Sequence, residues 1–558
     1  MNQTTGAIED VGDELLFVPL GGAGEIGMNF SLYGCRGRWL AVDLGIAFGD
    51  DTTPGIDIMV PDPAFAIACG DRLDGLVITH AHEDHIGAVA HLWPQLRCPV
   101  YASPFAAAVL KRKLGEAGLA GEVDVHVIPS GGSVEIGGFG VEFIRAAHSI
   151  PEAHVIAIRT PLGMLVHATD WKLDPEPLIG PVTDSAALKR LGDEGVLAMC
   201  CDSTNAGVPG HSKSEGALRN SLTEFIGDCD RRVAIACFSS NVARIETIIA
   251  AAEANGRSVC LVGRSLWRMV EAARETGHLA EDTRILTEHD VGFLAPEQVV
   301  LAVTGSQGEA QAALTRIAFG AHSNVHLDPG DTVIFSSRQI PGNEKSIGRV
   351  QNQLSRMGVE VITENDHFVH VSGHPAQDEL SQMYDWIRPK ILVPIHGELL
   401  HMNDHADFAE DHGIPEVVVG ENGSVIRLAP GPAEIVGQVH SGRIALDGSR
   451  MIPINGEIMR ARRRIVAGGA AVATVVVDGR GRLMADPQLS AQGVIDDEDD
   501  TPLRNAALAA ITQAVDGLSD RDRKSDDKIS EAARNAVRRS LRDTMGKRPS
   551  TQVHVVRL

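Results

Sequence analysis

The stretch Leu76-Val-Ile-Thr-His-Ala-His-Glu-Asp-His-Ile86 constrains this chain more than any other part of its sequence. Its first four residues are apolar or β-branched, a pattern typical of a buried strand. Three histidines and an aspartate follow within six positions, and burying them without partners would cost several kcal/mol. A bound cation offsets that cost, because neutral imidazole and carboxylate are ligands that zinc prefers. The pattern therefore predicts a metal-binding loop at the end of a strand.

Taken one at a time, these residues have ordinary explanations. Asp84 could cap a helix that begins near Ile86, and a single histidine is more often solvated or hydrogen-bonded than a metal ligand. The order His-x-His-x-Asp-His favours the metal, because packing does not require such a density of ligands. His80 and His82 can share one ion while Asp84 and His85 turn toward a second, so the spacing predicts two ions.

Three further candidate ligands, His148, Asp170 and His396, stand just past predicted strands, as His80 does. Each would more often be structural if it stood alone. Side chains at the ends of several adjacent strands can meet in one cluster, so we expect these three to join the metal loop. His396 lies more than 200 residues after Asp170, and a module inserted into a first domain would explain that separation.

Length and composition exclude several classes of protein. A chain of 558 residues is too long for one core and predicts two to four domains. No apolar run approaches a membrane span and the N-terminus is polar, so we expect a cytoplasmic protein without membrane attachment. The eight cysteines form no Cys-x-x-Cys pair, which leaves the histidines to carry the metal. The net charge of −24 argues against nonspecific binding of polyanions, but not against a nucleic-acid enzyme with local basic residues.

The segment from Leu15 to Leu44 has three strand-like runs and a G-x-G-x-x-G match that begins at Gly22. A dinucleotide-binding fingerprint must open a helix, whereas strand-like residues follow here. We therefore expect hairpins and keep a Rossmann fold as the weaker alternative. Asp43, at the end of the third strand, is expected to point toward the metal loop and hold a ligand histidine.

Strands and helices alternate from about Leu197 to Ile362, which predicts an α/β module with a parallel sheet. Its loops after strands, such as Asp202–Asn205 and Ser336–Gly342, are rich in small polar residues. Such loops suit phosphate oxygens, although they are also ordinary turns. The part of the chain after about Asn455 reads as a small α/β domain with basic and acidic runs but no catalytic constellation.

The order of the candidate ligands resembles the metallo-β-lactamase superfamily, and the module between Asp202 and His374 resembles its β-CASP group of nucleic-acid processors. Over nearly its whole length the chain resembles the ribonuclease J family. Besides the metal loop, the stretches that carry this resemblance are Gly24-Glu-Ile-Gly-Met-Asn29, Asp202-Ser-Thr-Asn205, Thr304-Gly-Ser-Gln-Gly-Glu309, Pro341-Gly-Asn-Glu344, His370-Val-Ser-Gly-His-Pro375 and Pro394-Ile-His-Gly-Glu398. His167-Ala-Thr-Asp170 departs slightly from the family pattern but keeps Asp170.

The resemblance implies an α/β chain in three parts. They are an αββα metallo-β-lactamase sandwich, an inserted β-CASP α/β domain and a small C-terminal α/β domain. We expect the sandwich at residues 1–200 and 369–452, the β-CASP domain at 201–368 and the C-terminal domain at 453–558.

The resemblance also implies two Zn²⁺ per chain, with Mn²⁺ or Mg²⁺ as alternatives in assays. One ion would take His80, His82 and His148, the other Asp84, His85 and His396, and Asp170 would bridge them. A hydroxide generated at the ions would attack phosphorus in line, which makes Asp84 catalytic as well as a ligand. His374 would donate a proton to the leaving oxygen, oriented by Asp202; alternatively, His374 only binds phosphate.

The implied activity is 5′ to 3′ exonuclease cleavage of single-stranded, 5′-monophosphorylated RNA, with endonuclease cleavage also known in the family. It would serve RNA maturation, including that of rRNA, and mRNA decay. The residues expected to hold the terminal phosphate are Ser239, Ser240, Asn241, His370, Ser372 and Gly373. The C-terminal domain would support a homodimer or homotetramer.

Three alternatives stay open from the residues themselves. One is a DNA-directed β-CASP nuclease, which assays on RNA and DNA oligomers would separate. Another is a small-ester metallohydrolase, which would not need the long insert between Asp170 and His396. The third is a scaffold subunit that has lost its metals, which predicts missing ligands, whereas all seven positions are present.

Overall fold

The computed structural model describes residues 12–340, 342–496 and 499–558. Three parts of the sequence discussed above lie outside this description. They are Pro341 of the stretch 341–344, residues 497–498 of the acidic run 496–500, and the first eleven residues of the predicted sandwich. The chain forms two compact units. The first joins the segment that ends at Ala47 to Met59–Arg443, and the second joins Phe48–Ile58 to Ile444–Leu558. The domain boundaries expected from the sequence stay predictions.

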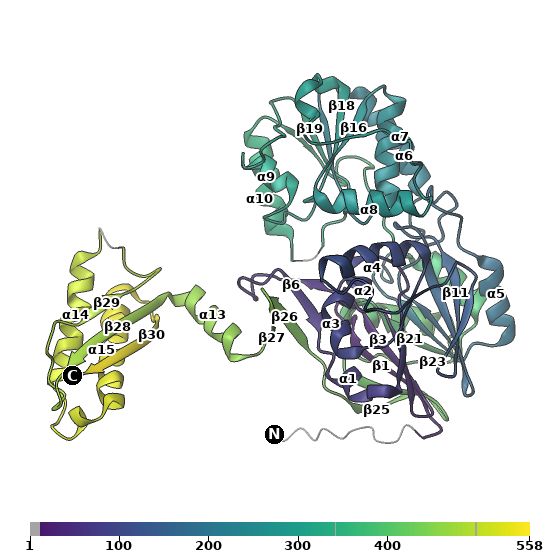
Figure 1. Ribbon diagram of the computed structural model, residues 1–558. Helices are drawn as coiled ribbons and strands as arrows, with labels where there is room; N and C mark the ends of the chain where they lie inside the picture. The colour runs from purple at the N-terminus through teal and green to yellow at the C-terminus, as the bar shows by residue number, and fades with distance from the viewer. Residues whose placement is uncertain (1–11, 341, 497–498) are drawn as a thin grey trace. The chain divides into compact units, whose positions relative to one another are not determined.

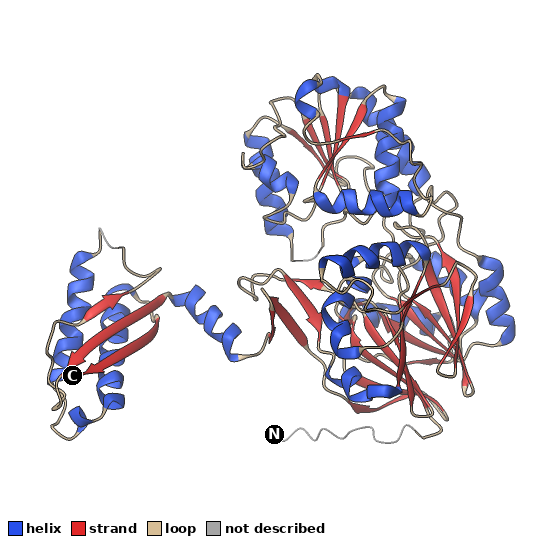
Figure 2. Ribbon diagram, viewed as in Figure 1, coloured by secondary structure: helices blue, strands red, loops and turns tan. Residues whose placement is uncertain are grey.

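Two sheets pack face to face in the first unit (Figures 1 and 2). One has eight strands, in the order β25 (Glu434–Gln438), β24 (Ser424–Ala429), β1 (Leu15–Gly21), β3 (Phe30–Cys35), β4 (Arg38–Val42), β7 (Leu73–Val77), β8 (Val100–Ala102) and β9 (Val125–Val127). The other has seven strands, in the order β10 (Ser133–Ile136), β11 (Phe139–Ala146), β12 (Ala153–Thr160), β13 (Gly163–Ala168), β14 (Ala198–Asp202), β21 (Ile391–Ile395) and β23 (Glu416–Val417). Buried apolar side chains from both sheets, among them Phe17, Tyr33, Phe143 and Val393, form the core between them.

Helices cover the outer face of each sheet. The eight-stranded sheet is covered by α1 (Ala64–Cys69), α3 (Val89–Leu96) and α4 (Pro104–Glu116), and the seven-stranded sheet by α5 (Ser185–Glu194), α11 (Gln377–Ile387) and α12 (Leu399–Asp411). Leu188, Tyr384 and Ala409 from the second set of helices pack onto the seven-stranded sheet. The predicted αββα sandwich is confirmed.

The first strands pair as the hairpins that we expected. β1 is antiparallel to β3, with Phe17 opposite Tyr33, and β3 is antiparallel to β4. The glycine-rich segment between β1 and β3 forms a two-residue strand, β2 (Ala23–Gly24), and bends rather than a helix. Gly22 has φ +81°, a conformation that favours glycine. The Rossmann alternative is therefore wrong, because these glycines shape a turn within a sheet.

The inserted module is a separate sheet with every neighbouring pair parallel. Its strands, in order, are β17 (Ile285–Leu286), β16 (Ser258–Val262), β18 (Val299–Val303), β15 (Val233–Ala236), β19 (Thr332–Phe335) and β20 (Glu360–Ile362). Its helices are α6 (Glu215–Asp228), α7 (Val242–Ala254), α8 (Arg264–Glu275), α9 (Ala313–Ala318) and α10 (Glu344–Arg356). The predicted parallel α/β module is confirmed. Its expected first strand is not part of it, because β14 pairs with β13 and β21 in the sandwich.

The second unit contains the hairpin β26 (Arg443–Asp447) and β27 (Arg450–Pro453), then α13 (Glu457–Gly468) and a three-stranded sheet. That sheet consists of β29 (Gln488–Ser490), β28 (Ala470–Val477) and β30 (Ser550–Arg557), and it packs on α14 (Thr501–Asp516) and α15 (Asp526–Met545). The basic run Arg460–Arg464 lies in α13. Among the described residues, no helix is long and apolar enough to cross a membrane.

Candidate metal centre and active site

Strand ends bring the predicted site residues together. β13, β14 and β21 lie side by side and parallel in the sandwich, so their carboxyl ends meet at one edge. Asp170 and His396 follow the first and last of these strands, and Asp202 ends the middle one. His80 and His82 follow β7 of the opposite sheet. The fold thus converts residues from distant parts of the sequence into one site.

Four donor atoms form a first cluster. Nε2 of His80 lies 3.0 Å from Nδ1 of His82, and Nε2 of His148 lies 3.1 Å from that same Nδ1 atom. Oδ2 of Asp170 lies 3.6 Å from the His80 nitrogen and 3.4 Å from the His148 nitrogen. These are the three histidines that we expected at one ion, together with the expected bridging carboxylate.

The second cluster has the other predicted ligands. Oδ1 of Asp170 lies 3.2 Å from Nε2 of His85 and 3.0 Å from Nε2 of His396. Oδ2 of Asp84 lies 3.5 Å from the His85 nitrogen and 3.4 Å from the His396 nitrogen. Asp170 presents one oxygen to each cluster. All seven residues predicted as ligands are therefore brought together in two groups.

The donor atoms fit a metal site. A tetrahedral ion about 2.0–2.1 Å from each of four donors places neighbouring donors about 3.3 Å apart. The separations between donors given above run from 3.0 to 3.6 Å. Oδ1 of Asp170 and Nε2 of His396 are buried and have no hydrogen-bond partner within the described part of the chain. Metal coordination would stabilise both atoms, since a buried polar atom without a partner is costly.

Neighbouring residues hold the rings of the ligand histidines. Nδ1 of His85 lies 2.7 Å from Oδ2 of Asp43, and Nδ1 of His80 lies 3.0 Å from Oγ1 of Thr79. The Thr79 hydroxyl itself donates to Asp43. Such partners fix the tautomer and orientation of a metal-bound imidazole. Asp43 thus contacts His85, one of the predicted ligands, as we expected; metal binding by His85 stays a prediction.

Replacing Asp43 by asparagine is expected to weaken metal binding by about 10–100-fold, because the charge that orients the His85 ring is lost. Competition with a chelator measures this affinity. Asp385→Asn serves as the matched control, since the Asp385 side chain is 73% exposed and lies on α11. An unchanged metal affinity in Asp43→Asn would show that the Asp43 carboxylate has only a structural role.

The helix after the metal loop begins earlier than we expected. α2 spans Glu83–Ile86, and the amide of Ile86 donates to the carbonyl of His82 at 2.9 Å. Asp84 and His85 therefore lie within the first turn, and the N-cap residue is His82. The alternative that Asp84 caps this helix is wrong. Its carboxylate points toward His85 and His396 instead.

Two site residues and one glycine have constrained positions. His396 has φ +52° and Asp43 has φ +61°, conformations that cost a non-glycine residue of order 1–3 kcal/mol and that cluster at functional sites. Gly373 accepts a hydrogen bond of 2.6 Å from Nδ1 of His148 through its carbonyl. A Cβ atom at Gly373 would lie 2.6 Å from Cε1 of that ring. Only glycine leaves room for the His148 ring here.

The electrostatic environment shifts the pKa values of the histidines in opposite directions. Burial and the neighbouring His148 lower the pKa of His82 to about 3, so the His82 ring is neutral at neutral pH. Burial also opposes the charged forms of His85 and His396, but Asp170 and Asp84 outweigh it and hold both pKa values well above the usual range. Because a metal binds neutral imidazole, metal binding at these two residues would be coupled to proton release.

His374 lies next to both clusters. Its ring centroid is 5.5 Å from that of His148 and 5.5 Å from that of His396. Its Nδ1 atom lies 2.7 Å from Oδ2 of Asp202. Burial alone would lower the pKa of His374, but Asp202 and Asp170 raise it above the usual value. The geometry thus places a partly buried, readily protonated imidazole beside the donor clusters.

The residues predicted to hold a phosphate are more spread out. Ser372 accepts from Asn205 Nδ2 at 2.8 Å. Two residues earlier, His370 has a buried Nδ1 atom without a hydrogen-bond partner among the described residues. Asn241 caps α7, because its side-chain oxygen accepts from the Arg244 amide at 2.8 Å. The next helical residues lie beside the metal site, since the amide of Ala243 donates to the carbonyl of Ser149. Ser240 precedes Asn241 in this turn, whereas Ser239 lines a small cavity with Lys113 and Arg268.

Sequence reasoning missed three residues of the site. Thr204 donates to the carbonyl of His396 at 3.1 Å, and Asn205 donates to the carbonyl of His374 at 3.2 Å. The exposed Arg338 donates to the side-chain oxygen of Asn205. All three lie in loops that the sequence predicted to suit phosphate, and this loop composition could have identified them.

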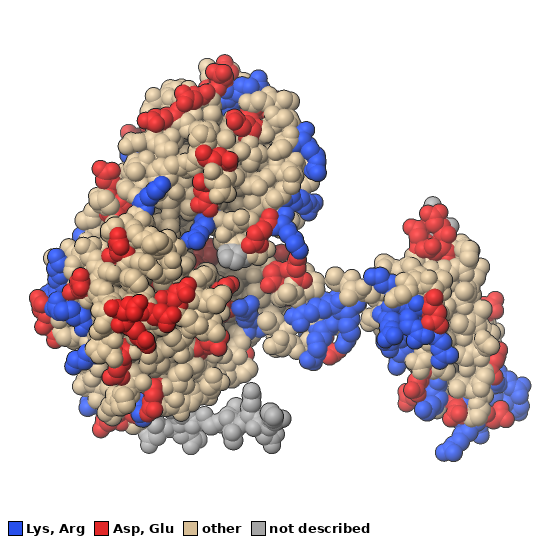
Figure 3. Space-filling view, turned by 180° about the vertical axis from the view of Figure 1, so that it is seen from behind, with Lys and Arg blue, Asp and Glu red and all other residues tan. Residues whose placement is uncertain are grey.

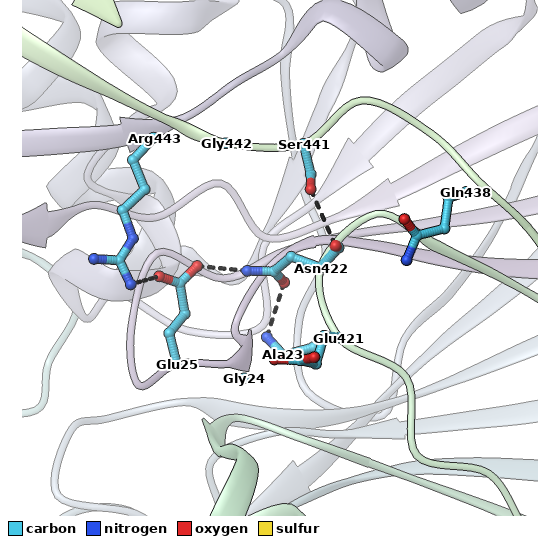
Figure 4. Close-up of a pocket in the computed structure, with 9 residues that line it drawn as sticks. All are labelled: Ala23, Gly24, Glu25, Glu421, Asn422, Gln438, Ser441, Gly442 and Arg443. Carbon is cyan, nitrogen blue, oxygen red and sulfur yellow. Dashed lines mark hydrogen bonds and ion pairs between the residues drawn. The ribbon is translucent and has the colours of Figure 1, made fainter. Parts of the chain in front are cut away.

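A polar cavity of about 280 Å³ lies next to the strand that follows His396 (Figure 4). Its lining residues are Ala23, Gly24, Glu25, Glu421, Asn422, Gln438, Ser441, Gly442 and Arg443. Asn422 donates to Glu25, and Glu25 is paired with Arg443, so these polar groups satisfy one another. β2, in one wall, pairs with β22 (Gly397–Glu398). The amide of His396 also donates to the carbonyl of Gly22 at 2.6 Å, so this wall supports the backbone at the candidate ligand His396.

Family models match the chain in four places. The β-lactamase superfamily domain matches residues 51–188, and the ribonuclease J β-CASP domain matches residues 230–354. The Zn-dependent metallo-hydrolase RNA specificity domain matches residues 358–419, and the ribonuclease J C-terminal domain matches residues 457–558. Together with the sandwich and its clustered imidazoles and carboxylates, these matches define a metallo-hydrolase of the β-lactamase superfamily with a β-CASP insertion.

Similar proteins narrow this class to a family. The chain is 42% identical over 551 residues to the ribonuclease J of Sinorhizobium meliloti, with 98% of each chain covered. It is 35% identical to the ribonuclease J of Thermus thermophilus, covering 96% of this chain and 94% of that one. The chain belongs to the ribonuclease J family. A crystal structure of an Enterococcus faecalis protein of unknown function shares the fold, with a TM-score of 0.52 and 16% identity, over 74% of this chain and 100% of that one.

Proposed function

We propose that this chain is a 5′ to 3′ exoribonuclease that uses two zinc ions to degrade single-stranded RNA carrying a 5′-monophosphate, with endonuclease cleavage as a second mode. Its family membership makes it a metal-dependent ribonuclease. The roles in rRNA maturation and mRNA decay belong to the proposal, as does the cytoplasmic location. The observation that carries it is a chain of hydrogen bonds that joins the donor clusters, through the segment His370–His374, to Arg338, where we place the pocket for the terminal phosphate.

The chemistry divides between the two clusters and His374. When bound, a pair of divalent cations lowers the pKa of water to about 7 and neutralises charge on the phosphate. The first cluster, with Asp170, would hold one ion and the second cluster would hold the other. His374 would donate its proton to the 3′-oxygen that leaves. Asp202 would keep the His374 ring oriented, with the proton-donating nitrogen Nε2 facing the clusters.

The link to the pocket runs through a few neighbouring residues. The carbonyl of Gly373 accepts a hydrogen bond from His148 of the first cluster. Ser372, which precedes Gly373, is hydrogen-bonded to Asn205. Arg338 is bonded to that same asparagine. A phosphate held at this pocket would therefore lie close to the metal clusters, as stepwise release of mononucleotides requires.

Two arginines, Arg244 and Arg338, bring positive charge close to His370, beside this proposed pocket. Burial, then Arg244 and Arg338, hold the pKa of His370 well below its usual value. Arg244 is paired with the buried carboxylate of Glu215. Arg338 has no carboxylate partner within the described residues, and its exposed guanidinium suits a phosphate bidentately. The helix α7 also begins here, and the N-terminus of a helix favours an anion.

The test compares RNA with a 5′-monophosphate against the same RNA with a 5′-triphosphate. We expect faster degradation of the monophosphate, because the proposed pocket holds a single terminal phosphate next to the donor clusters. Arg338→Gln should raise KM for the monophosphate RNA and reduce its advantage about tenfold or more, which corresponds to one charged hydrogen bond. Arg349→Gln, on α10 of the same module, is the control. Equal rates on both RNAs would remove the terminal-phosphate pocket from the proposal.

Two further parts of the proposal, the substrate class and the oligomeric state, have their own tests. DNA oligomers of the same sequence should be cleaved more slowly, and equal cleavage would favour a DNA-directed enzyme. We further propose a homodimer through the C-terminal part of the chain, two of which form a homotetramer, and light scattering tests it.

Residues 444–558 have 19 Lys and Arg against 16 Asp and Glu, unlike the acidic chain as a whole. In Figure 3, Lys and Arg gather around α13, where RNA would meet less repulsion than elsewhere.

A further inference from the structure

One loop, Asp202–Asn205, contacts every part of the candidate site. Asp202 holds the His374 ring at 2.7 Å. Thr204 donates to the carbonyl of His396. Asn205 reaches the phosphate-binding segment, as described above. The position of this loop therefore sets the proton donor, a metal ligand and the pocket relative to one another.

The remaining residue of the loop, Ser203, points away from the site. Its hydroxyl lies 2.9 Å from Nδ1 of His405 on α12, and Nε2 of that ring lies 2.5 Å from the hydroxyl of Tyr384 on α11. Ser203 and His405 are fully buried, and Tyr384 is 2% exposed. Burial lowers the pKa of His405 to about 4, so one ring nitrogen donates and the other accepts. The three side chains form a continuous hydrogen-bonded relay from the loop to two helices.

The helix α12 also packs tightly against the metal-ligand strand. A Cβ atom built at Gly397, next to His396, would lie 3.1 Å from Cβ of Ser203 and 3.1 Å from Cβ of His401. The amide of Ser203 donates to the carbonyl of Ile395 at 2.9 Å. The backbone of the loop is thus already attached to the strand end, and the relay adds a second, side-chain attachment behind it.

We propose that the Ser203–His405–Tyr384 relay is a positioning element for the chemical step: it fixes the direction in which Asp202 meets His374 and Thr204 meets His396. This inference rests on the role proposed above for Asp202 and His374. None of the three relay residues touches the substrate. A misplacement of about 1 Å in an active site can cost about 100-fold in rate, so a small shift of the loop is sufficient.

A purely structural role makes a different prediction. If the relay only satisfies buried polar groups, losing either of its two hydrogen bonds should lower stability and leave kcat per folded, metal-loaded molecule unchanged. If it positions the loop, only the bond to Ser203 should matter directly for kcat, because that bond reaches the loop. The two bonds of His405 can be removed one at a time.

The experiment compares His405→Asn with His405→Gln in the full-length, metal-loaded protein. An asparagine amide can replace Nδ1 and keep the bond to Ser203, whereas a glutamine amide can replace Nε2 and keep the bond to Tyr384. We expect both variants to lose similar thermal stability and to retain their metal. His405→Gln should lose about 10–100-fold in kcat, with KM for the RNA unchanged, and His405→Asn should retain most of its kcat.

Two further variants complete the comparison. Ser203→Ala should reproduce the kcat loss of His405→Gln, and combining the two should add little because both remove the same bond. Ser130→Ala is the control, since it removes a hydroxyl from another buried histidine, His154, without touching the loop. Wild-type kcat in folded His405→Gln, or equal kcat losses in His405→Asn and His405→Gln, would overturn the positioning role.

Failure of the positioning role can be distinguished from failure of the proposed function. If His374→Ala keeps full activity, the role proposed for His374 fails. A slow His405→Gln would then still support positioning, through Thr204 and His396. If His374→Ala is inactive and His405→Gln is not slowed, the proposed chemistry stands and the relay is structural.

Discussion

Asp170→Asn is expected to reduce RNA cleavage by at least about 10³-fold and to lower the metal content of the purified protein. The aspartate presents one oxygen to each donor cluster, and in asparagine one of the two becomes an amide nitrogen that cannot bind a cation. One cluster would then lose a donor atom, and the negative charge that lies between the two clusters would be lost. The charge stabilisation by a metal ion is worth several kcal/mol in the transition state, and each 1.36 kcal/mol corresponds to a factor of ten in rate.

Three measurements check this result: elemental analysis, turnover of one 5′-labelled RNA, and the rise in unfolding temperature on adding zinc. A metal present at 1,000 times its Kd stabilises the folded state by about 4 kcal/mol, so the variant should show a smaller rise. Binding of the RNA should change little, because the pocket residues are intact. Asp385→Asn again serves as the control. A variant with full metal content and full turnover would contradict the two-cluster arrangement.

His374→Ala is expected to slow the chemical step by about 10²–10⁴-fold while leaving the metal content and KM unchanged, as expected for loss of a general acid. A sharper test uses an RNA with sulfur in place of the bridging 3′-oxygen at the scissile bond. A thiolate leaves without a proton, since thiols have a pKa near 8.5. The difference between variant and wild type should therefore shrink on this RNA. A raised KM with unchanged kcat would instead assign His374 to phosphate binding alone, and a loss of metal would make it a ligand.

The pH dependence gives a second check on the same residue. His374 must be protonated to act as the acid, so activity should be lost as the pH rises through its pKa. Asp202 and Asp170 raise that pKa against the effect of burial, and both charges therefore move the alkaline limb to higher pH. Asp202→Asn removes one of these charges and should move the limb to lower pH. An unmoved limb would mean that another group titrates there.

Much of the site could be predicted because its chemistry is local. Four of the seven candidate ligands lie within six positions, and the other three follow strand-like runs whose ends a sheet brings together. The same argument anticipated Asp43 as a partner of a histidine in the predicted metal loop, and the 2.7 Å contact to His85 shows that partnership. The hairpins at the start of the chain and the inserted parallel module were likewise predictable, because such elements leave short-range patterns. The αββα sandwich was expected only from the family resemblance.

Other features left no such pattern. β14 looked like the first strand of the inserted module but pairs with strands on either side of the insertion. The bond between Arg338 and Asn205 joins residues 133 positions apart, and that between Ser203 and His405 joins residues 202 apart. Neither arginine nor a buried serine is unusual in its own stretch of sequence. A contact of this kind depends on the packing of several elements, which no local window contains.

The amino-acid order alone established which side chains can bind cations and roughly where strands end, because ligand chemistry and hydrophobic periodicity are properties of short segments. Packing assigned those side chains to two clusters, with Asp170 between them, and placed His374, Arg338 and the relay around them. The physical reason is distance: a metal site requires donors within a few ångströms, and for residues hundreds of positions apart only the folded sheets bring them that close.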